Sequence, residues 1–325
     1  MNEFDQLLKT FSSIVLQASP LIIAVCGETI TERAGLINLS LDGTMLLSAM
    51  TGFIVGLQTG SLVLGFLAAA AVGMLFALIV AFGSIRLKQS QVAIGFVLTL
   101  LGDDLSSFLG QNYTRIPGPF VMKAGIPLLE DIPILGPLFF DQDPVVYFAL
   151  LLVGVTWWFL SRTQPGLKLR GVGERPQAAF ARGVKVNRLR YVYALVGGAL
   201  VGIAGAAYSL NVKLGWSEGH IRGLGWIALA IVIFGGWSPV RGAIGAILFG
   251  ATKALATVLQ RTFPEVSVVA FNTIPWILMI AVLVVSTSDL TERIINLAPT
   301  SWRRPLRRFL RVSAPMALGT PFGED

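Results

Sequence analysis

The chain has very few of the side chains from which most enzyme and metal sites are built. Among 325 residues it has one cysteine, Cys26, and one histidine, His220, and only 13% of its residues are charged. A single cysteine excludes an internal disulfide framework, and the scarcity of both residue types leaves no cluster of soft metal ligands. A Ser-His-Asp or Cys-His site would depend on His220, which lies in a short glycine-flanked loop. We therefore expect no catalytic residue and no metal site.

The sequence also lacks a nucleotide-binding loop. No G-x-x-x-x-G-K-[ST] pattern occurs, so we expect this chain to bind no cofactor and not to be an enzyme. If it takes part in ATP-driven transport, ATP and Mg must bind a separate subunit. The alternative is an ion-coupled secondary carrier of a small polar solute, in which acidic groups within the membrane relay protons or sodium ions.

Apolar sequence, by contrast, is abundant, at 54% of the residues. A membrane-spanning helix needs about 20 mostly apolar residues. Nine segments suit this requirement, namely 12–27, 41–57, 61–82, 91–109, 144–161, 190–211, 223–236, 241–260 and 268–287. The seventh is short and rich in glycine, which predicts a broken or partial span. We predict an all-α polytopic membrane protein with about nine transmembrane helices (roughly 8–10), broken or re-entrant near the core, in one domain over 12–288.

Lysine and arginine are concentrated between the apolar segments. The loop 162–190 contains eight of them and one acid, and the tail 289–325 contains six arginines. Because cytoplasmic loops of membrane proteins are enriched in basic residues, we expect both segments to be cytoplasmic and the loop 110–143 to be external. Basic loops also account for the net charge of +7 without nucleic acid. Residues 1–11 are too short and polar to span, and predict an interfacial segment.

Two features concern the chain ends. The first ten residues contain acids and lack a cationic start, which argues against a cleavable signal. The stretch 301–311 interleaves basic and apolar side chains, as expected of a segment lying on an anionic membrane surface. The residues after Arg311 are predicted to be disordered.

The stretch from Cys26 to Gly43 inserts polar side chains between two apolar segments. These are Glu28, Glu32, Arg33, Asn38, Ser40 and Asp42. Polar groups at membrane depth are costly unless they face a bundle interior, a partner chain or a watery cavity. A polar, glycine-punctuated insert therefore predicts irregular backbone buried within a transport protein.

Members of this insert suit either a translocation path or a structural knot. We interpret Arg33 with Glu28 or Glu32 as a salt-bridged knot, since an uncharged polar solute seldom needs paired charges. Asn38 and Ser40 are better candidates for hydrogen-bonding groups along a path.

Three aspartates lie near expected helix ends. Asp42 is predicted to cap the second span, because aspartate is favoured at helix starts, with a gate as the alternative. Asp103 and Asp104 lie near the outer end of the fourth span. They are predicted either to line an external vestibule or to cap the helix there.

The basic loop contains the pattern of a short helix. Pro176 can start it, Glu174 suits its positive end, and Gly183 can end it in a left-handed cap. Such a helix with small residues, including Ala178 and Ala179, can fit a groove on another protein. The alternative is a loop that lies on the membrane surface.

Three stretches resemble one family of transport proteins. GETITERAGLINLSLDGTMLL resembles the second-span region of bacterial ABC importer permeases of the ribose, nucleoside and branched-chain amino acid group. GVGERPQAAFARGVKVNRLRYVYALVGGALVGIAGAAY is similar to the coupling loop and following helix of that family, and GWIALAIVIFGGWSPVRGAIGAILFGATKAL to its late glycine-rich spans. The resemblance covers about residues 18–288, most of the chain. The run ERAGLINLSLDG is closer to nucleoside or simple-sugar permeases than to ribose permeases.

The resemblance implies a function and a set of partners. The chain would be the permease subunit of an importer in the bacterial inner membrane, forming the path for a nucleoside or simple sugar. An ABC ATPase subunit would receive the helix around Ala178–Gly183, and an extracytoplasmic binding protein or lipoprotein would deliver substrate. The chain starts about one span later than ribose permeases, which suits nucleoside systems with paired longer and shorter permeases; a homodimer remains the alternative. The residues implied to couple to the ATPase are Gly173, Glu174, Pro176, Ala178, Ala179 and Gly183.

Overall fold

The computed structural model describes residues 3–125, 140–263, 265–287 and 313–323, with isolated positions 127, 296, 299 and 303. Within these ranges the regular structure is entirely helical. The α-helices are α1 (Glu3–Arg33), α2 (Leu41–Thr59), α3 (Leu62–Ile85), α4 (Gln91–Gly110), α5 (Pro144–Arg162), α6 (Gln164–Glu174), α7 (Pro176–Ala181), α8 (Val186–Ala207), α9 (Leu224–Phe234), α10 (Pro239–Thr262) and α11 (Val268–Thr287). A π-helical turn, η3 (Tyr208–Val212), extends α8, and a 3-10 turn, η1 (Gln111–Tyr113), follows α4.

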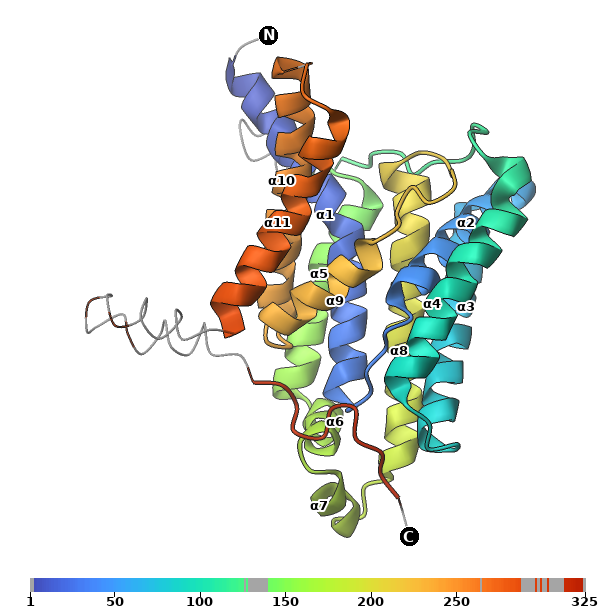
Figure 1. Cartoon of the computed structure of the whole chain (residues 1–325), viewed down its shortest axis with the longest axis vertical. Helices are drawn as coiled ribbons and strands as arrows, with labels where there is room; N and C mark the ends of the chain where they lie inside the picture. Colours follow the sequence, from blue (N-terminus) through green and yellow to red (C-terminus); the bar gives the residue numbers. More distant parts are fainter. Residues whose placement is uncertain are drawn as a thin grey trace.

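All nine predicted spans are helices, and within the part of the chain that the structure describes seven of them are long and apolar enough to cross a membrane. The seventh predicted segment forms α9, which has only 11 residues and lies within the bundle (Figure 1). An α-helix of that length extends about 16 Å, roughly half of a hydrocarbon core. The predictions of an all-α polytopic membrane protein and of a partial helix in its interior are therefore confirmed.

The non-helical part of the polar insert is shorter than the insert itself. Helix α1 continues through Glu28, Glu32 and Arg33, and the non-helical backbone is confined to residues 34–40. That segment rises from the lower end of α1 into the bundle, so α2 begins in the interior (Figure 1). Residues 3–10 belong to the same helix, α1, whose apolar span begins at Thr10.

Small residues set how closely the long helices pack. Helix α3 packs along α8, and α1 packs against α8 and α10. A Cβ at Gly198 would lie 2.5 Å from the carbonyl oxygen of Gly73, and one at Gly202 would overlap the carbonyl oxygen of Ala69. The Gly198-x-x-x-Gly202 pair is therefore a packing face between α8 and α3.

The two ends of the bundle carry different loops. Helices α6 and α7 and the turn between α3 and α4 lie at the lower end in Figure 1, and the N-terminus lies at the upper end. This arrangement agrees with the predicted alternation of loops. The middle of the predicted external loop, 128–139, and the basic stretch 304–312 lie outside the described residues.

The prediction of disorder after Arg311 is wrong for residues 313–323. This segment, here called the C-terminal strap, runs along the lower end of the bundle beside α6 (Figure 1). Its backbone bonds to Gly173 and Gly35, and Ala317 and Phe322 are buried.

Candidate functional site

The two glutamates of α1 lie one turn apart and face the same side of the helix. Both are buried, with Glu28 fully enclosed. The indole N–H of Trp237 donates to Glu32, and the backbone N–H of Asn38 donates to Glu28 at 3.3 Å. The pair therefore joins α1 to the turn after α9 and to segment 34–40.

Arg33 does not form the expected salt bridge with either glutamate. Its guanidinium donates to the carbonyl oxygens of Trp237 and Gly236 at 3.1 and 3.4 Å, and pairs with Glu174 at 3.8 Å. The reason is geometric, because adjacent helical residues point about 100° apart, so Arg33 cannot share the face of Glu32. The structure therefore replaces the predicted knot with a link between α1, α6 and the end of α9.

The extended segment 34–40 lies in the interior, where other parts of the bundle bond to several of its polar groups. Gln91 of α4 accepts from the N–H of Ile37 at 2.7 Å, and Thr99 donates to the carbonyl of Leu39 at 2.8 Å. The side-chain oxygen of Asn38 accepts from the N–H of Ser40 at 3.2 Å, as in a side-chain-closed turn. Both residues are buried in this conformation, which places them in the bundle core rather than on an open surface.

Asp42 caps a helix, but not the one predicted. It lies in the first turn of α2, where Ser40 is the cap residue. Its carboxylate accepts from the N–H groups of Gly223 and Gly225, at 2.8 and 2.9 Å, and so caps the start of α9. A carboxylate stabilises the unpaired N–H groups and the positive end of a helix. A Cβ at Gly225 would overlap the backbone of Asp42, so glycine is required for this approach.

The two aspartates of α4 have different surroundings. Asp103 pairs with Arg222, just before α9, at 2.8 Å, whereas Asp104 is exposed. Helix α4 continues to Gly110, so neither residue caps its end. Asp103 therefore holds the loop that leads into α9. Nothing in the geometry assigns a function to Asp104.

The loop before α9 also holds the single histidine, which is half-buried. The Nδ1 atom of His220 contacts the carbonyl oxygen of Ser217 at 2.5 Å, and its Nε2 atom lies 3.5 Å from the hydroxyl of Ser209 in η3. Burial lowers the pKa of His220 to about 4, and the positive charges of Lys213 and Lys253 act in the same direction. The imidazole is therefore neutral near pH 7 and packs in the loop as a hydrogen-bonded group.

The predicted short helix in the basic loop is present as α7. Pro176 occupies its first turn and is buried, and Gly183 follows its end with φ +78°. Ala178 is exposed, and Ala179 is half-buried against Val172, Val186 and Phe322. Of the residues implied to couple to an ATPase, Ala178 and Gly183 are therefore at the surface.

Gly173 and Glu174 instead attach α6 to the bundle. A Cβ at Gly173 would overlap the carbonyl oxygen of Arg33, so this glycine allows α6 to touch the end of α1. Glu174 pairs with Arg33 and accepts from the backbone N–H of Met316 in the strap. Displacement of α6–α7 is thereby linked to α1 and segment 34–40.

Sequence reasoning missed Arg190, which it counted among the positive charges of a loop. Arg190 is 1% exposed and donates to the carbonyl oxygens of Ala34 and Thr320 at 3.2 and 3.1 Å. It thus joins α8, segment 34–40 and the strap. Trp237 was also missed. Neither residue stands out in the sequence, because an arginine beside a basic loop and a tryptophan near a helix end are both common in membrane proteins.

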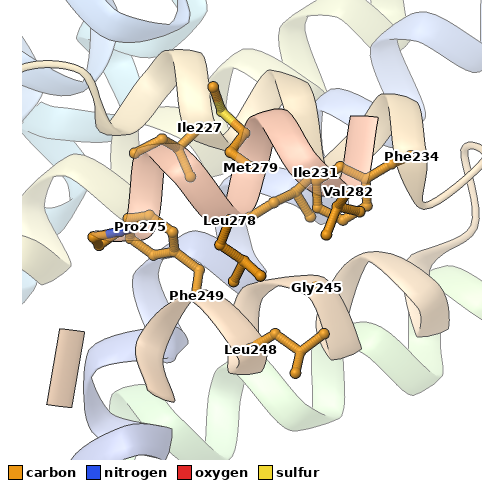
Figure 2. A pocket seen from close by; sticks show the side chains of 10 residues that line it. All are labelled: Ile227, Ile231, Phe234, Gly245, Leu248, Phe249, Pro275, Leu278, Met279 and Val282. Carbon is orange, nitrogen blue, oxygen red and sulfur yellow. The ribbon is translucent and has the colours of Figure 1, made fainter. Parts of the chain in front are cut away.

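An apolar crevice lies between α9, α10 and α11 (Figure 2). Its lining contains Ile231, Phe234, Leu248, Phe249 and Met279, and no side chain in the lining bears a hydrogen-bonding group. Hydroxyl and amide groups of a polar solute would lose their hydrogen bonds to water there without replacement. The crevice is therefore a poor site for such a solute.

Metal coordination has no candidate in the described ranges, where no three His, Cys, Asp or Glu residues come together in a suitable group. In the interior, Glu28 and Asp42 accept from backbone N–H groups and Glu32 accepts from an indole, whereas the Oε2 atom of Glu28 has no hydrogen-bond partner among the described residues. The bundle interior thus contains the starts of α2 and α9 with polar side chains around them. A short helix, α7, protrudes at one end of the bundle. Such an arrangement suits the movement of a solute, with no chemical step.

Comparison with known proteins agrees with this geometry. A family model described as "Branched-chain amino acid transport system / permease component" matches residues 10–283. A protein of Haloferax volcanii provisionally named as a glucose ABC transporter permease is 41% identical over 248 residues, covering 75% of each chain. The guanosine ABC transporter permease NupQ of Bacillus subtilis is 35% identical over 288 residues, covering 83% of this chain and 89% of NupQ.

A third relative comes from another bacterium. The nucleoside ABC transporter permease NupC of Lactococcus lactis is 33% identical over 269 residues, covering 79% of this chain and 85% of NupC. Proteins of this family are membrane components of ABC transporters and are not enzymes; ATP hydrolysis takes place on a partner subunit. Since both the family model and these relatives cover most of the sequence, the chain belongs to the branched-chain amino acid transport system permease family of ABC transporters.

Proposed function

We propose that this permease forms the membrane path of an importer for a nucleoside or a simple sugar, coupled through α7 to a separate ATPase that binds ATP and Mg. The observation that carries the substrate class is the similarity to guanosine, nucleoside and glucose permeases over at least three quarters of the chain. The alternative of an ion-coupled carrier finds no support in that similarity. The buried glutamates, moreover, bond to Trp237 and Asn38 within the bundle.

The proposed path passes the junction where α2 and α9 begin. Two helix starts in a bundle interior present N–H groups and polar side chains at membrane depth, as in other transporters with broken helices. Asn38, Ser40 and Asp42 are buried there; Ser40 donates to Asn38, and Asp42 accepts from the start of α9. The Asp103–Arg222 ion pair would stabilise the external opening of the path, because it attaches the loop that leads into α9 to helix α4.

Coupling follows from how α6 and α7 are attached. Ala178 presents a small exposed side chain on a protruding helix, which suits insertion into a groove of an ATPase. Gly173 and Glu174 connect that helix to Arg33 at the end of α1. Movement of the ATPase would therefore displace α6–α7 as a unit and shift segment 34–40, a change of the hinge or shear type.

The remaining partners follow from the family. An ABC permease acts together with an ATPase and further transporter components. For this chain we propose a second permease chain, either a paralogue or a second copy, and an extracytoplasmic binding protein or lipoprotein. The basic lower end would face the cytoplasm and the strap would lie there too, in a bacterial inner membrane.

The test is uptake of radiolabelled guanosine and glucose by cells that express the complete transporter. Ala178→Arg should abolish uptake while the amount of permease in the membrane stays unchanged. Gln89→Arg adds the same side chain at an exposed position in the turn between α3 and α4 at the same end, and should leave uptake unchanged. Normal uptake with Ala178→Arg would contradict coupling through α7. Transport by the purified chain alone in vesicles under an ion gradient would establish a secondary carrier.

A further inference from the structure

A basic cleft lies between α6, α7 and the C-terminal strap. Five of its lining residues are basic and one is acidic; these six are Arg33, Lys168, Arg170, Arg175, Arg182 and Glu174. Met316 of the strap forms part of the wall. The cleft is therefore built by three segments far apart in sequence, namely the end of α1, residues 167–184 and the strap, and it includes residues of the helix proposed to contact the ATPase.

Backbone hydrogen bonds hold the strap in this position. The N–H of Ala317 donates to the carbonyl of Gly173 at 2.9 Å, and the N–H of Gly319 donates to the carbonyl of Gly35 at 3.0 Å. The guanidinium of Arg190 adds a bond to Thr320 at 3.1 Å. Since each of these partners is part of the folded bundle or of α6, the strap has a defined location.

A small apolar cluster attaches the strap to α7. Phe322 is 7% exposed and packs with Val172 and Val186. Its ring also meets that of Phe180 in α7 edge-on, with 5.8 Å between centroids. Removing a phenylalanine ring from water favours this packed position. The strap therefore supports the orientation of α7 as well as one wall of the cleft.

The charge of the cleft is mostly uncompensated. Its acid, Glu174, is already paired with Arg33 at 3.8 Å. Arg175 and Arg182 are exposed, and the buried Nε of Arg170 has no hydrogen-bond partner in the part of the chain that the structure describes. Guanidinium groups bind carboxylates through paired, charge-assisted hydrogen bonds. An acidic ligand fits this lining.

The position of the cleft favours a protein over a lipid as that ligand. Arg175, Ala178, Ala179 and Arg182 belong to α7 or adjoin it, and α7 lies at the far lower end of the molecule, beyond the ends of the long helices (Figure 1). A phospholipid headgroup would bind nearer to those helix ends. The surface around α7 is the one that a cytoplasmic partner reaches first.

We infer that this cleft receives an acidic segment of the ATPase subunit, and that the C-terminal strap is thereby part of the docking surface. The inference rests on the proposed function. The first contact would be the small side chain of Ala178 in a groove of the ATPase. The cleft would add a second, ionic contact, in which arginines of the permease bind carboxylates of the ATPase. It also gives the strap a role, because loss of the strap would remove one wall of the cleft and the support of Phe180.

The first experiment reverses charge in the cleft. The tagged permease is co-expressed with the other subunits of its transporter, and the ATPase subunit that co-purifies is measured over a range of NaCl concentrations. Arg175→Glu with Arg182→Glu should weaken retention of the ATPase about tenfold and reduce its dependence on salt. Lys185→Glu with Arg188→Glu makes the same change in net charge at exposed positions outside the cleft, and should leave retention unchanged.

The second experiment tests the strap. Truncation after Arg311 and Phe322→Ala should each lower retention of the ATPase. Since Cys26 is the single cysteine and is buried, introduced cysteines report on docking of the strap. Met316→Cys should react rapidly with a maleimide and Ala317→Cys slowly, because these positions are 73% and 7% exposed. Phe322→Ala should speed the reaction at position 317.

The outcomes separate the two proposals. Absence of the ATPase from the unmutated permease would overturn the proposed function. Retention by the unmutated permease that neither the charge reversal nor the loss of the strap changes would overturn this inference alone. If the charge reversal reduced binding of the permease to vesicles rich in phosphatidylglycerol but not retention of the ATPase, the cleft would be a lipid site and the inference would be wrong.

Discussion

Two junctions hold this permease together, and each is centred on one buried charge. At the interior junction, Asp42 accepts from the N–H groups at the start of α9. At the lower junction, Arg190 donates to the carbonyls of Ala34 and Thr320. An acid bonds to backbone donors and a base to backbone acceptors, so in both places a charge is compensated by peptide groups. The bonds join residues more than 100 positions apart in sequence.

The junctions differ in what lies beside them. The interior junction is enclosed, and Asp42 is 4% exposed. The lower junction is next to the open basic cleft. Loss of the first should therefore disturb α9 and the proposed path, whereas loss of the second should disturb the strap and the proposed docking surface. This contrast can be tested by single substitutions.

The largest expected effect is that of Arg190→Ala. It removes two charge-assisted hydrogen bonds and leaves the buried carbonyl of Ala34 without this donor, at a cost of about 3 kcal/mol. The thermal midpoint of the purified protein in detergent should fall clearly. Arg190→Lys keeps the charge and should recover part of the loss. An unchanged midpoint for Arg190→Ala would show that the lower junction does not depend on this residue.

Asp42→Ala should have the next largest effect, about 2 kcal/mol, because it leaves N–H groups of α9 buried without an acceptor. Asp104→Ala, an exposed aspartate on α4, is the control and should be nearly neutral. Uptake should fall with Asp42→Ala, while retention of the ATPase subunit should not. Loss of the ATPase with Asp42→Ala would mean that the two junctions are not independent.

Two glycines of α6 offer a matched pair at the lower junction. Gly173→Ala forces a Cβ against the carbonyl oxygen of Arg33, whereas a Cβ at Gly171 meets nothing within 4 Å. Overpacking costs about 1–3 kcal/mol, while alanine in an open helical position gains up to about 1 kcal/mol over glycine. We therefore expect a lower thermal midpoint for Gly173→Ala and an equal or higher one for Gly171→Ala. Equal loss in both variants would contradict the close approach of α6 to α1.

The smallest effect concerns His220, in the loop leading to the interior junction. Its pKa is lowered from 6.5 to about 4 by burial. Between these values the unfolded chain binds a proton that the folded chain does not, so stability decreases as pH falls from about 6.5 to 4. The thermal midpoint of the unmutated protein should fall more between pH 7 and 4.5 than that of His220→Gln. Parallel curves would show that His220 is not buried in solution.

Prediction from the sequence succeeded where a single segment carries the signal. The nine apolar segments became helices, and proline and glycine marked the start of α7 and the turn after it. The short, glycine-rich seventh segment became the partial helix α9. These features depend on the length, hydrophobicity and local backbone preferences of consecutive residues.

Prediction failed where the partner of a residue is distant. Arg33 was assigned to the glutamates of its own helix and binds Glu174 and the turn after α9. Asp42 was assigned to α2 and caps α9. The strap gave no sign of order by itself, because its hydrogen bonds are made to other segments.

The sequence by itself therefore determined that this protein is a bundle of membrane helices with a basic lower end, a short helix outside the bundle and polar residues at membrane depth. The tertiary structure decided which of those polar residues meet. A buried charge must find a compensating group wherever the packed helices bring one close, and hydrophobic periodicity does not encode that position. For Asp42 at the start of α9 and for Arg190 beside the strap, the packing of the helices determined the partner of the buried charge.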